Sequence, residues 1–431
     1  MPPSARTTEP GTVASVTPER PPADELLDEL SRTRERTLAF AASIDRADLE
    51  RQFDPLLSPL AWDLAHIAAY EDLWLVQEHA GRPALMPDLS TAYDAIATPR
   101  AIRGQIEALD APGAIAFLEA VRERTLEAAQ AEGVSEELFE MVVRHEQQHM
   151  ETMCQAVLLA ALGNFDPPYR REAPGSPGDP RGPDFVEVPG GPFTLGCADD
   201  GFAFDNERPA HEVELEPFAI GRLPVTTGDW LAFVEEGGYD RREWWDDDGW
   251  AWRQEEQAGA PLYWNLETGT ERTACGERPL DPARPVAHVC WFEAQAFARS
   301  RGARLPTEAE WERAATWEGR GAPGPGEAWT GQDGFDTAPA GSFPTAASDC
   351  GALDLVGNLW EWTATEFDGY PGFRAHPYPE YSEVFFRDGY RVLRGGSWAT
   401  SARVATPTFR NWDLPRRRQI FCGVRLARDA S

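Results

Sequence analysis

The sequence predicts two domains of different class, an all-α helical bundle followed by an α+β domain with much irregular backbone. Apolar residues recur at helical spacing from Ala23 to Gly163. Residues 166–183 are dense in Pro, Gly, Arg and Asp, which is typical of a linker. From Phe185 onward, short apolar runs alternate with Gly, Pro and clustered Trp. We therefore expect domains at 23–165 and 184–431.

Composition excludes several classes of protein. A net charge of −32 argues against a nucleic-acid partner, because such binding neutralises phosphates with Lys and Arg. No apolar run approaches the roughly 20 residues that span a bilayer, and the N-terminus lacks a signal-peptide layout. The six cysteines form no C-x-x-C pair, which favours reduced cytosolic thiols. We expect a cytoplasmic monomer without a membrane partner, and a disordered tail at 1–22.

The first domain should hold four long helices joined by short connections. Their expected ranges are 24–46, 59–80, 110–131 and 136–162. Ser58 and Pro59 are typical of a helix start, and Ser135 before two glutamates opens the last helix. This pattern favours an up-and-down bundle, whose interior is a common place for metal ligands.

A metal site is the first hypothesis for the string His145-Glu146-Gln147-Gln148-His149. Two histidines four apart on a helix project from one face and can bind a single ion. His66 lies on the second expected helix and supplies a third imidazole if the helices pack together. The sequence therefore predicts a three-histidine centre inside the bundle.

Two other interpretations stay open for this string. It also satisfies the zincin pattern H-E-x-x-H, in which Glu146 would be the general base of a metalloprotease. A metzincin would need Gly and His where this chain has Thr152 and Gln155. The histidines could also be structural and bind no metal.

Five ordered strings in the second half resemble the formylglycine-generating-enzyme family, which implies a C-type-lectin-like fold. They are FVEVPGG (185–191), RLPTEAEWE (304–312), GNLWEW (357–362), RGGSW (394–398) and GVR (423–425). Short helices are expected near 227–234 and 291–300, and a third starts at Thr307 with a capping box to Glu310. Thr400 and Ala405 stand where that family carries reactive cysteines, so the resemblance implies no thiol chemistry of that kind.

A DinB-like bundle with three histidines fused to such a domain resembles the ergothioneine-biosynthesis sulfoxide synthases. The resemblance implies a non-heme iron oxidoreductase that uses Fe(2+) and O2 to join the sulfur of γ-glutamylcysteine to the imidazole of hercynine. Three neutral imidazoles leave three positions open on an octahedral iron(II), enough for imidazole, thiolate and O2.

The same resemblance assigns roles to further residues. It implies that Arg100 and Arg103 bind the carboxylates of the thiol substrate, for which bidentate guanidinium groups are suited. It implies Tyr378 as proton donor. The other implied substrate-binding residues are Gln148, Tyr381, Asn411, Trp412 and Asp413, with Trp412 facing the quaternary ammonium of hercynine.

Relatives with other substrates or chemistry remain as alternatives. Close relatives could use cysteine as sulfur donor, histidine as acceptor, or a selenosugar. DinB-like bundles also serve as metal-dependent thiol transferases, which need no oxidant. O2 uptake that requires iron(II), thiol and hercynine together would separate the oxidative from the non-oxidative class.

Overall fold

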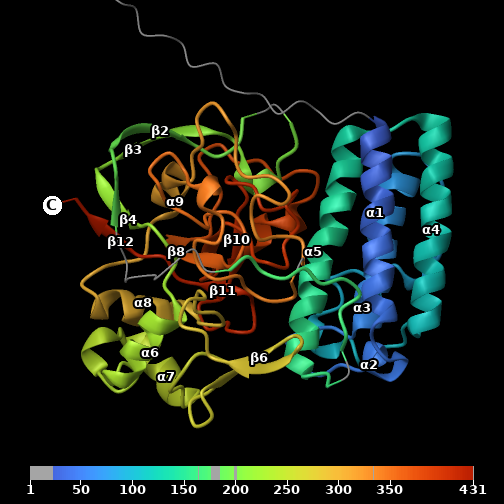
Figure 1. Ribbon diagram of the computed structural model, residues 1–431. Helices are drawn as coiled ribbons and strands as arrows, with labels where there is room; N and C mark the ends of the chain where they lie inside the picture. The colour runs from blue at the N-terminus through green and yellow to red at the C-terminus, as the bar shows by residue number, and fades with distance from the viewer. Residues whose placement is uncertain (1–22, 164, 176–184, 199–200, 333, 431) are drawn as a thin grey trace, which may run out of the picture.

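The computed structural model describes residues 23–163, 165–175, 185–198, 201–332 and 334–430. The expected tail at 1–22 and residues 176–183 of the expected linker lie outside these residues. Figure 1 shows a helical domain beside a domain that contains all the strands, with α5 on the side of the bundle that faces the strands. Among the described helices, none has the length and apolar character needed to cross a membrane. The expected two-domain fold class is confirmed.

Four long helices build the first domain, close to the expected ranges. They are α1 (Ala23–Ala42), α3 (Leu60–Glu71) with its π-helical continuation η1 (Asp72–Glu78), α4 (Ala111–Glu132) and α5 (Glu136–Ala160). Shorter elements are α2 (Arg46–Glu50), η2 (Pro87–Leu89) and η3 (Arg100–Ile102). Ser135 caps α5 as expected. Ser58 does not cap α3, because its hydroxyl accepts a hydrogen bond from Arg103 Nη1 at 2.8 Å and the helix begins at Leu60.

A buried network of four charges ties these helices together. Glu146 of α5 accepts hydrogen bonds from Arg34 Nε of α1 at 2.9 Å and from Arg122 Nη2 of α4 at 3.4 Å. Glu71 of α3 accepts from Arg34 Nη2 at 2.7 Å and from Arg122 Nε at 2.8 Å. Burial disfavours the ionised form of Glu71, but Arg122 and Arg34 outweigh it and lower its pKa to about 2. Two cations thus balance two anions in the bundle core.

Short strands and irregular backbone make up the second domain. One sheet has the order β10 (Asn411–Asp413), β9 (Arg391–Arg394), β8 (Trp360–Glu366), β11 (Cys422–Gly423), and another β1 (Phe185–Val188), β4 (Phe218–Gly221), β12 (Ala427–Asp429). A two-stranded sheet pairs β2 (Gly191–Leu195) with β3 (His211–Leu215). A three-stranded sheet has the order β5 (Trp264–Asn265), β6 (Thr270–Thr273), β7 (Gly276–Pro279). The helices are α6 (Thr227–Glu235), α7 (Asp247–Glu255), α8 (Trp291–Ser300) and α9 (Glu308–Ala314), with 3-10 turns η4 (Asp205–Glu207), η5 (Arg242–Trp244), η6 (Pro344–Ala346), η7 (Pro379–Tyr381) and η8 (Glu383–Phe385).

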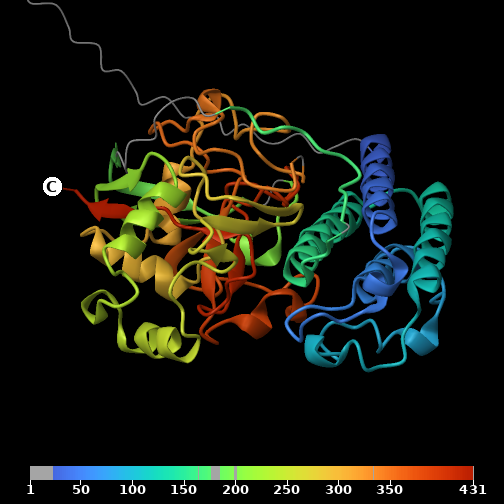
Figure 2. The same cartoon turned by 60° about the horizontal axis from the view of Figure 1, so that its bottom comes forward.

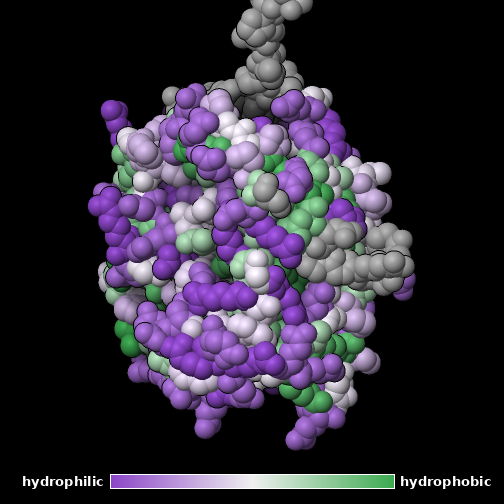
Figure 3. Space-filling model, turned by 90° about the vertical axis from the view of Figure 1, so that its left-hand side faces the viewer, coloured by the Kyte–Doolittle hydropathy of each residue, from purple (hydrophilic) through white to green (hydrophobic). Residues whose placement is uncertain are grey.

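Helix α5 lies on the side of the bundle next to the second domain, as the turned view in Figure 2 also shows, and it is one of the bundle elements that contact that domain. Its buried Glu151 accepts hydrogen bonds from Trp360 Nε1 at 2.7 Å, Ser397 Oγ at 2.9 Å and Thr400 Oγ1 at 2.5 Å. Thr400 therefore helps to hold the two domains together. The outer face of the second domain in Figure 3 is mostly hydrophilic, in keeping with the acidic composition.

Candidate metal centre

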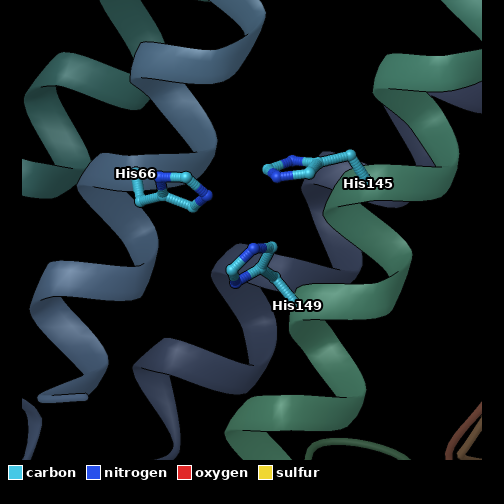
Figure 4. A group of neighbouring side chains, drawn as sticks. All are labelled: His66, His145 and His149. Atoms are coloured by element: carbon cyan, nitrogen blue, oxygen red, sulfur yellow. The ribbon is translucent and has the colours of Figure 1, made fainter. Parts of the chain in front are cut away.

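Three histidine side chains converge between α3 and α5. One ligand atom from each of His66, His145 and His149 lies within 4.8 Å of the others. Figure 4 shows His66 projecting from α3 towards the other two imidazoles, which project from successive turns of α5. The four-residue spacing on one helix and the packing of α3 against α5 together produce the cluster.

Burial favours the neutral form of His66 and His145, and a hydrogen bond orients the ring of His66. His66 Nδ1 lies 2.6 Å from the carbonyl oxygen of Tyr93 and donates to it, which leaves Nε2 for a metal. The pKa of His66 lies well below its usual value because of burial, and that of His145 likewise. A metal needs the unprotonated nitrogen, so the donor set of three imidazoles fits a divalent ion such as iron, zinc or copper.

The environment of Glu146 does not suit the general base of a zincin. It is buried and lies within hydrogen-bonding distance of Arg34 and Arg122. A general base in a metalloprotease must reach a metal-bound water, whereas this carboxylate is neutralised by two guanidinium groups in the bundle core. The histidine pair therefore belongs to a different kind of metal site.

Tyrosines from both domains lie next to the histidines. The ring of Tyr70, one turn after His66 on α3, stacks on the ring of His145 with centroids 3.6 Å apart. Its hydroxyl lies 3.1 Å from the hydroxyl of Tyr378 in the second domain. Burial raises the pKa of Tyr378 to about 12, so this phenol keeps its proton at neutral pH. Tyr70 was not among the residues expected from the sequence.

A second polar contact crosses the domain boundary at Gln148. Its Nε2 donates to the hydroxyl of Tyr381 at 3.4 Å. Burial raises the pKa of Tyr381 well above its ordinary value. The loop that carries Tyr378 and Tyr381 is thus placed over the α5 turn that carries His145, Gln148 and His149.

Arg100, the first residue of η3, and Arg103, which follows its last residue, occupy different environments. Arg103 is buried, lies over the ring of Trp62 at 3.6 Å, and donates to Thr98 O at 2.9 Å and Ala95 O at 3.0 Å as well as to Ser58. Burial lowers its pKa to about 10. Arg100 is exposed. Only Arg100 therefore presents its guanidinium to the solvent.

Strand β10 brings the three expected residues 411–413 to the same region. Trp412 stacks on Phe367 with centroids 4.2 Å apart and meets Tyr381 edge-on at 5.9 Å. Asp413 accepts from Arg417 Nε at 3.1 Å. Burial raises the pKa of Asp413, and the charges of Arg417 and Arg100 oppose that rise. The charge of Arg100 from the bundle therefore acts on a carboxyl of the second domain.

The fold and the three-histidine cluster define a class, a two-domain protein that joins a DinB bundle to a formylglycine-generating-enzyme-like domain. The DinB superfamily model matches residues 29–153, and the sulfatase-modifying factor enzyme 1-like domain model matches residues 171–430. The chain belongs to the hercynine oxygenase family. It is 46% identical to the hercynine oxygenase of Mycolicibacterium thermoresistibile over 94% of this chain and 95% of that one. The hercynine oxygenase of Mycolicibacterium smegmatis is 43% identical over 94% of this chain and 99% of its own.

A solved structure of PvdO from Pseudomonas aeruginosa is also similar. Its sequence identity is 23% and its TM-score 0.40, and the match covers 60% of this chain and 100% of that one.

Proposed function

We propose that this chain is an iron(II)- and O2-dependent sulfoxide synthase that joins the sulfur of γ-glutamylcysteine to the imidazole of hercynine. The observation that carries the proposal is a cluster of three imidazoles beside the hydroxyl groups of Tyr70 and Tyr378, in a chain 46% identical to a hercynine oxygenase. We further propose that the protein acts in the cytoplasm, as its composition leads us to expect, and that it acts as a monomer.

The proposed reaction balances without a further reductant. A C–H bond of the imidazole and the S–H bond of the thiol are lost, a C–S bond forms, and one oxygen atom is added to sulfur. Bond formation and sulfur oxidation each supply two electrons, which reduce O2 to the sulfoxide oxygen and one water. Iron(II) held by His66, His145 and His149 would supply the capacity to bind and activate O2 beside the thiolate.

Residues near the histidines are suited to bind the thiol substrate. Exposed Arg100 would bind a carboxylate of γ-glutamylcysteine, and Asp413 its amino group. Arg103 belongs to the same proposed site and would support it by fixing the loop that carries Arg100, because three of its N–H groups bond to that loop or to Ser58.

Hercynine would bind through both its imidazole and its trimethylammonium group. Phe367 covers one face of Trp412, and we assign the other face to the quaternary ammonium, with Asn411 as a polar neighbour. Gln148 would bind the imidazole, because it precedes His149 in the chain and its amide donates to the hydroxyl of Tyr381.

Tyr378 would donate a proton during O2 reduction. Its phenol is protonated at neutral pH, and its contact with the Tyr70 hydroxyl fixes the position of the oxygen atom. Because Tyr70 also stacks on His145, the position of this proton donor is linked to that of a metal ligand.

The test is an anaerobic mixture of iron(II)-loaded protein, one thiol and one acceptor, started with air. We expect O2 uptake and the coupled sulfoxide only with γ-glutamylcysteine and hercynine together, detected by mass spectrometry. Faster coupling with cysteine, with a selenosugar, or with histidine as acceptor would reassign the substrate. Thiol transfer without O2 uptake would contradict the proposal.

A further inference from the structure

The carboxylate of Asp63 on α3 is buried close to the metal site without a hydrogen-bond partner. The residue is 1% exposed, and neither of its carboxylate oxygens has a hydrogen bond within the described part of the chain. Its Oδ1 lies 3.5 Å from Nδ1 of His149. That nitrogen is also buried and lacks a hydrogen bond to any described residue.

This arrangement is costly for the fold alone. A buried carboxylate without hydrogen bonds loses the favourable free energy of its hydration, and no interaction in the protein replaces it in full. The charge of Arg103 favours the pair electrostatically, yet the N–H groups of Arg103 with defined partners point to Thr98, Ser58 and Ala95. Stability of the bundle therefore does not explain an acidic residue at position 63.

We propose that Asp63 is a positioning residue for the metal ligand His149. Its carboxylate accepts the Nδ1 proton of His149, which fixes the tautomer that leaves Nε2 for the metal. The separation of 3.5 Å exceeds an N–H···O bond of about 2.9 Å, so we expect the imidazole to turn slightly towards Asp63 when a metal fixes Nε2.

The three ligands would then differ in donor strength. His66 donates its Nδ1 proton to a neutral carbonyl, that of Tyr93, whereas His149 would donate to a charged carboxylate. A carboxylate partner makes an imidazole a stronger base than a carbonyl does. His149 would therefore bind the metal more tightly than His66. This inference rests on the metal site of the proposed function.

The test is an anaerobic titration of metal-free protein with iron(II) in competition with a chelator. Asp63→Ala should weaken iron(II) binding about 10-fold to 100-fold, the usual effect of losing such a partner. Asp63→Asn should lose less affinity for iron(II), because the amide oxygen of the asparagine can still accept the Nδ1 proton of His149. The Tm of each metal-free variant is measured alongside, because removal of Asp63 also removes a negative charge that favours the buried Arg103 guanidinium.

Asp72→Asn is the matched control. Asp72 is also a buried carboxylate next to α3, but it accepts hydrogen bonds from Leu85 N at 3.0 Å and Arg124 Nη1 at 3.0 Å. Its replacement should lower the Tm and leave the affinity of the folded protein for iron(II) unchanged.

Asp63→Ala with wild-type affinity, or with a loss of affinity that merely follows a lower Tm, would overturn the positioning role. If the wild type still makes the sulfoxide in that case, the proposed function stands. Wild-type protein that binds no iron(II) would overturn both.

Discussion

Replacing Glu146 by Gln should destabilise the folded protein by about 3–5 kcal/mol, the usual cost of removing one partner from a buried ion pair. The structure supports the upper part of this range. Arg34 donates to Glu146 through Nε at 2.9 Å and Nη2 at 3.1 Å, and Arg122 donates at 3.4 Å. Without the charge of Glu146, the network keeps two buried guanidinium groups and a single carboxylate, that of Glu71.

The assay is urea unfolding of the metal-free protein, followed by the far-ultraviolet signal of the helices. Glu123→Gln is the control, because Glu123 lies exposed on α4. We expect the midpoint to fall for Glu146→Gln and to stay within error for Glu123→Gln, while the three histidines still bind metal in the folded fraction. Wild-type stability combined with loss of all activity would rule out a structural role for Glu146, because the general base of a zincin would behave that way.

Two further predictions concern the substrates. Arg100→Ala should raise the KM for γ-glutamylcysteine far more than that for hercynine, because a carboxylate contact is lost; equal effects in steady-state kinetics would remove Arg100 from the thiol site. Tyr378→Phe removes the phenolic proton and the contact with Tyr70 at 3.1 Å but keeps the ring, so substrate affinities should change little while the product shifts from the coupled sulfoxide to the sulfinic acid of the thiol. A wild-type product ratio in mass spectrometry would show that Tyr378 is not the proton donor, and Tyr381 would be the next candidate.

Helical periodicity predicts the first domain well, because each long amphipathic stretch carries its own signal. The expected ranges 59–80 and 136–162 correspond to α3 with η1 and to α5. The strands of the second domain have two to seven residues and little alternation, so their pairing could not be placed. Helix α7 was also missed, since its sequence DDGWAWRQE has no apolar stripe of helical period.

The three histidines could be found because the metal-binding pattern is local on α5 and His66 lies on another strong helix. Tyr70 and Asp63 lie one turn to either side of His66, but they belong to no sequence motif that indicates a place in the metal site. Their partners lie far along the chain, since Tyr70 meets Tyr378 308 residues later and Asp63 faces His149 of another helix. Such contacts depend on packing between elements, which spacing along one helix does not specify. Packing between elements also explains why Arg100 is exposed and Arg103 is buried.

We propose that His66, His145 and His149 hold one iron(II) ion on which coupling depends. The decisive experiment is an anaerobic titration of the metal-free wild type with iron(II), with the sulfoxide product measured after air is admitted. We predict one iron(II) per chain, and loss of both the iron and the product in His66→Ala, His145→Ala and His149→Ala, because the site has no other protein ligand among the described residues. Full iron content and turnover in any of these variants would rule out a three-histidine iron site.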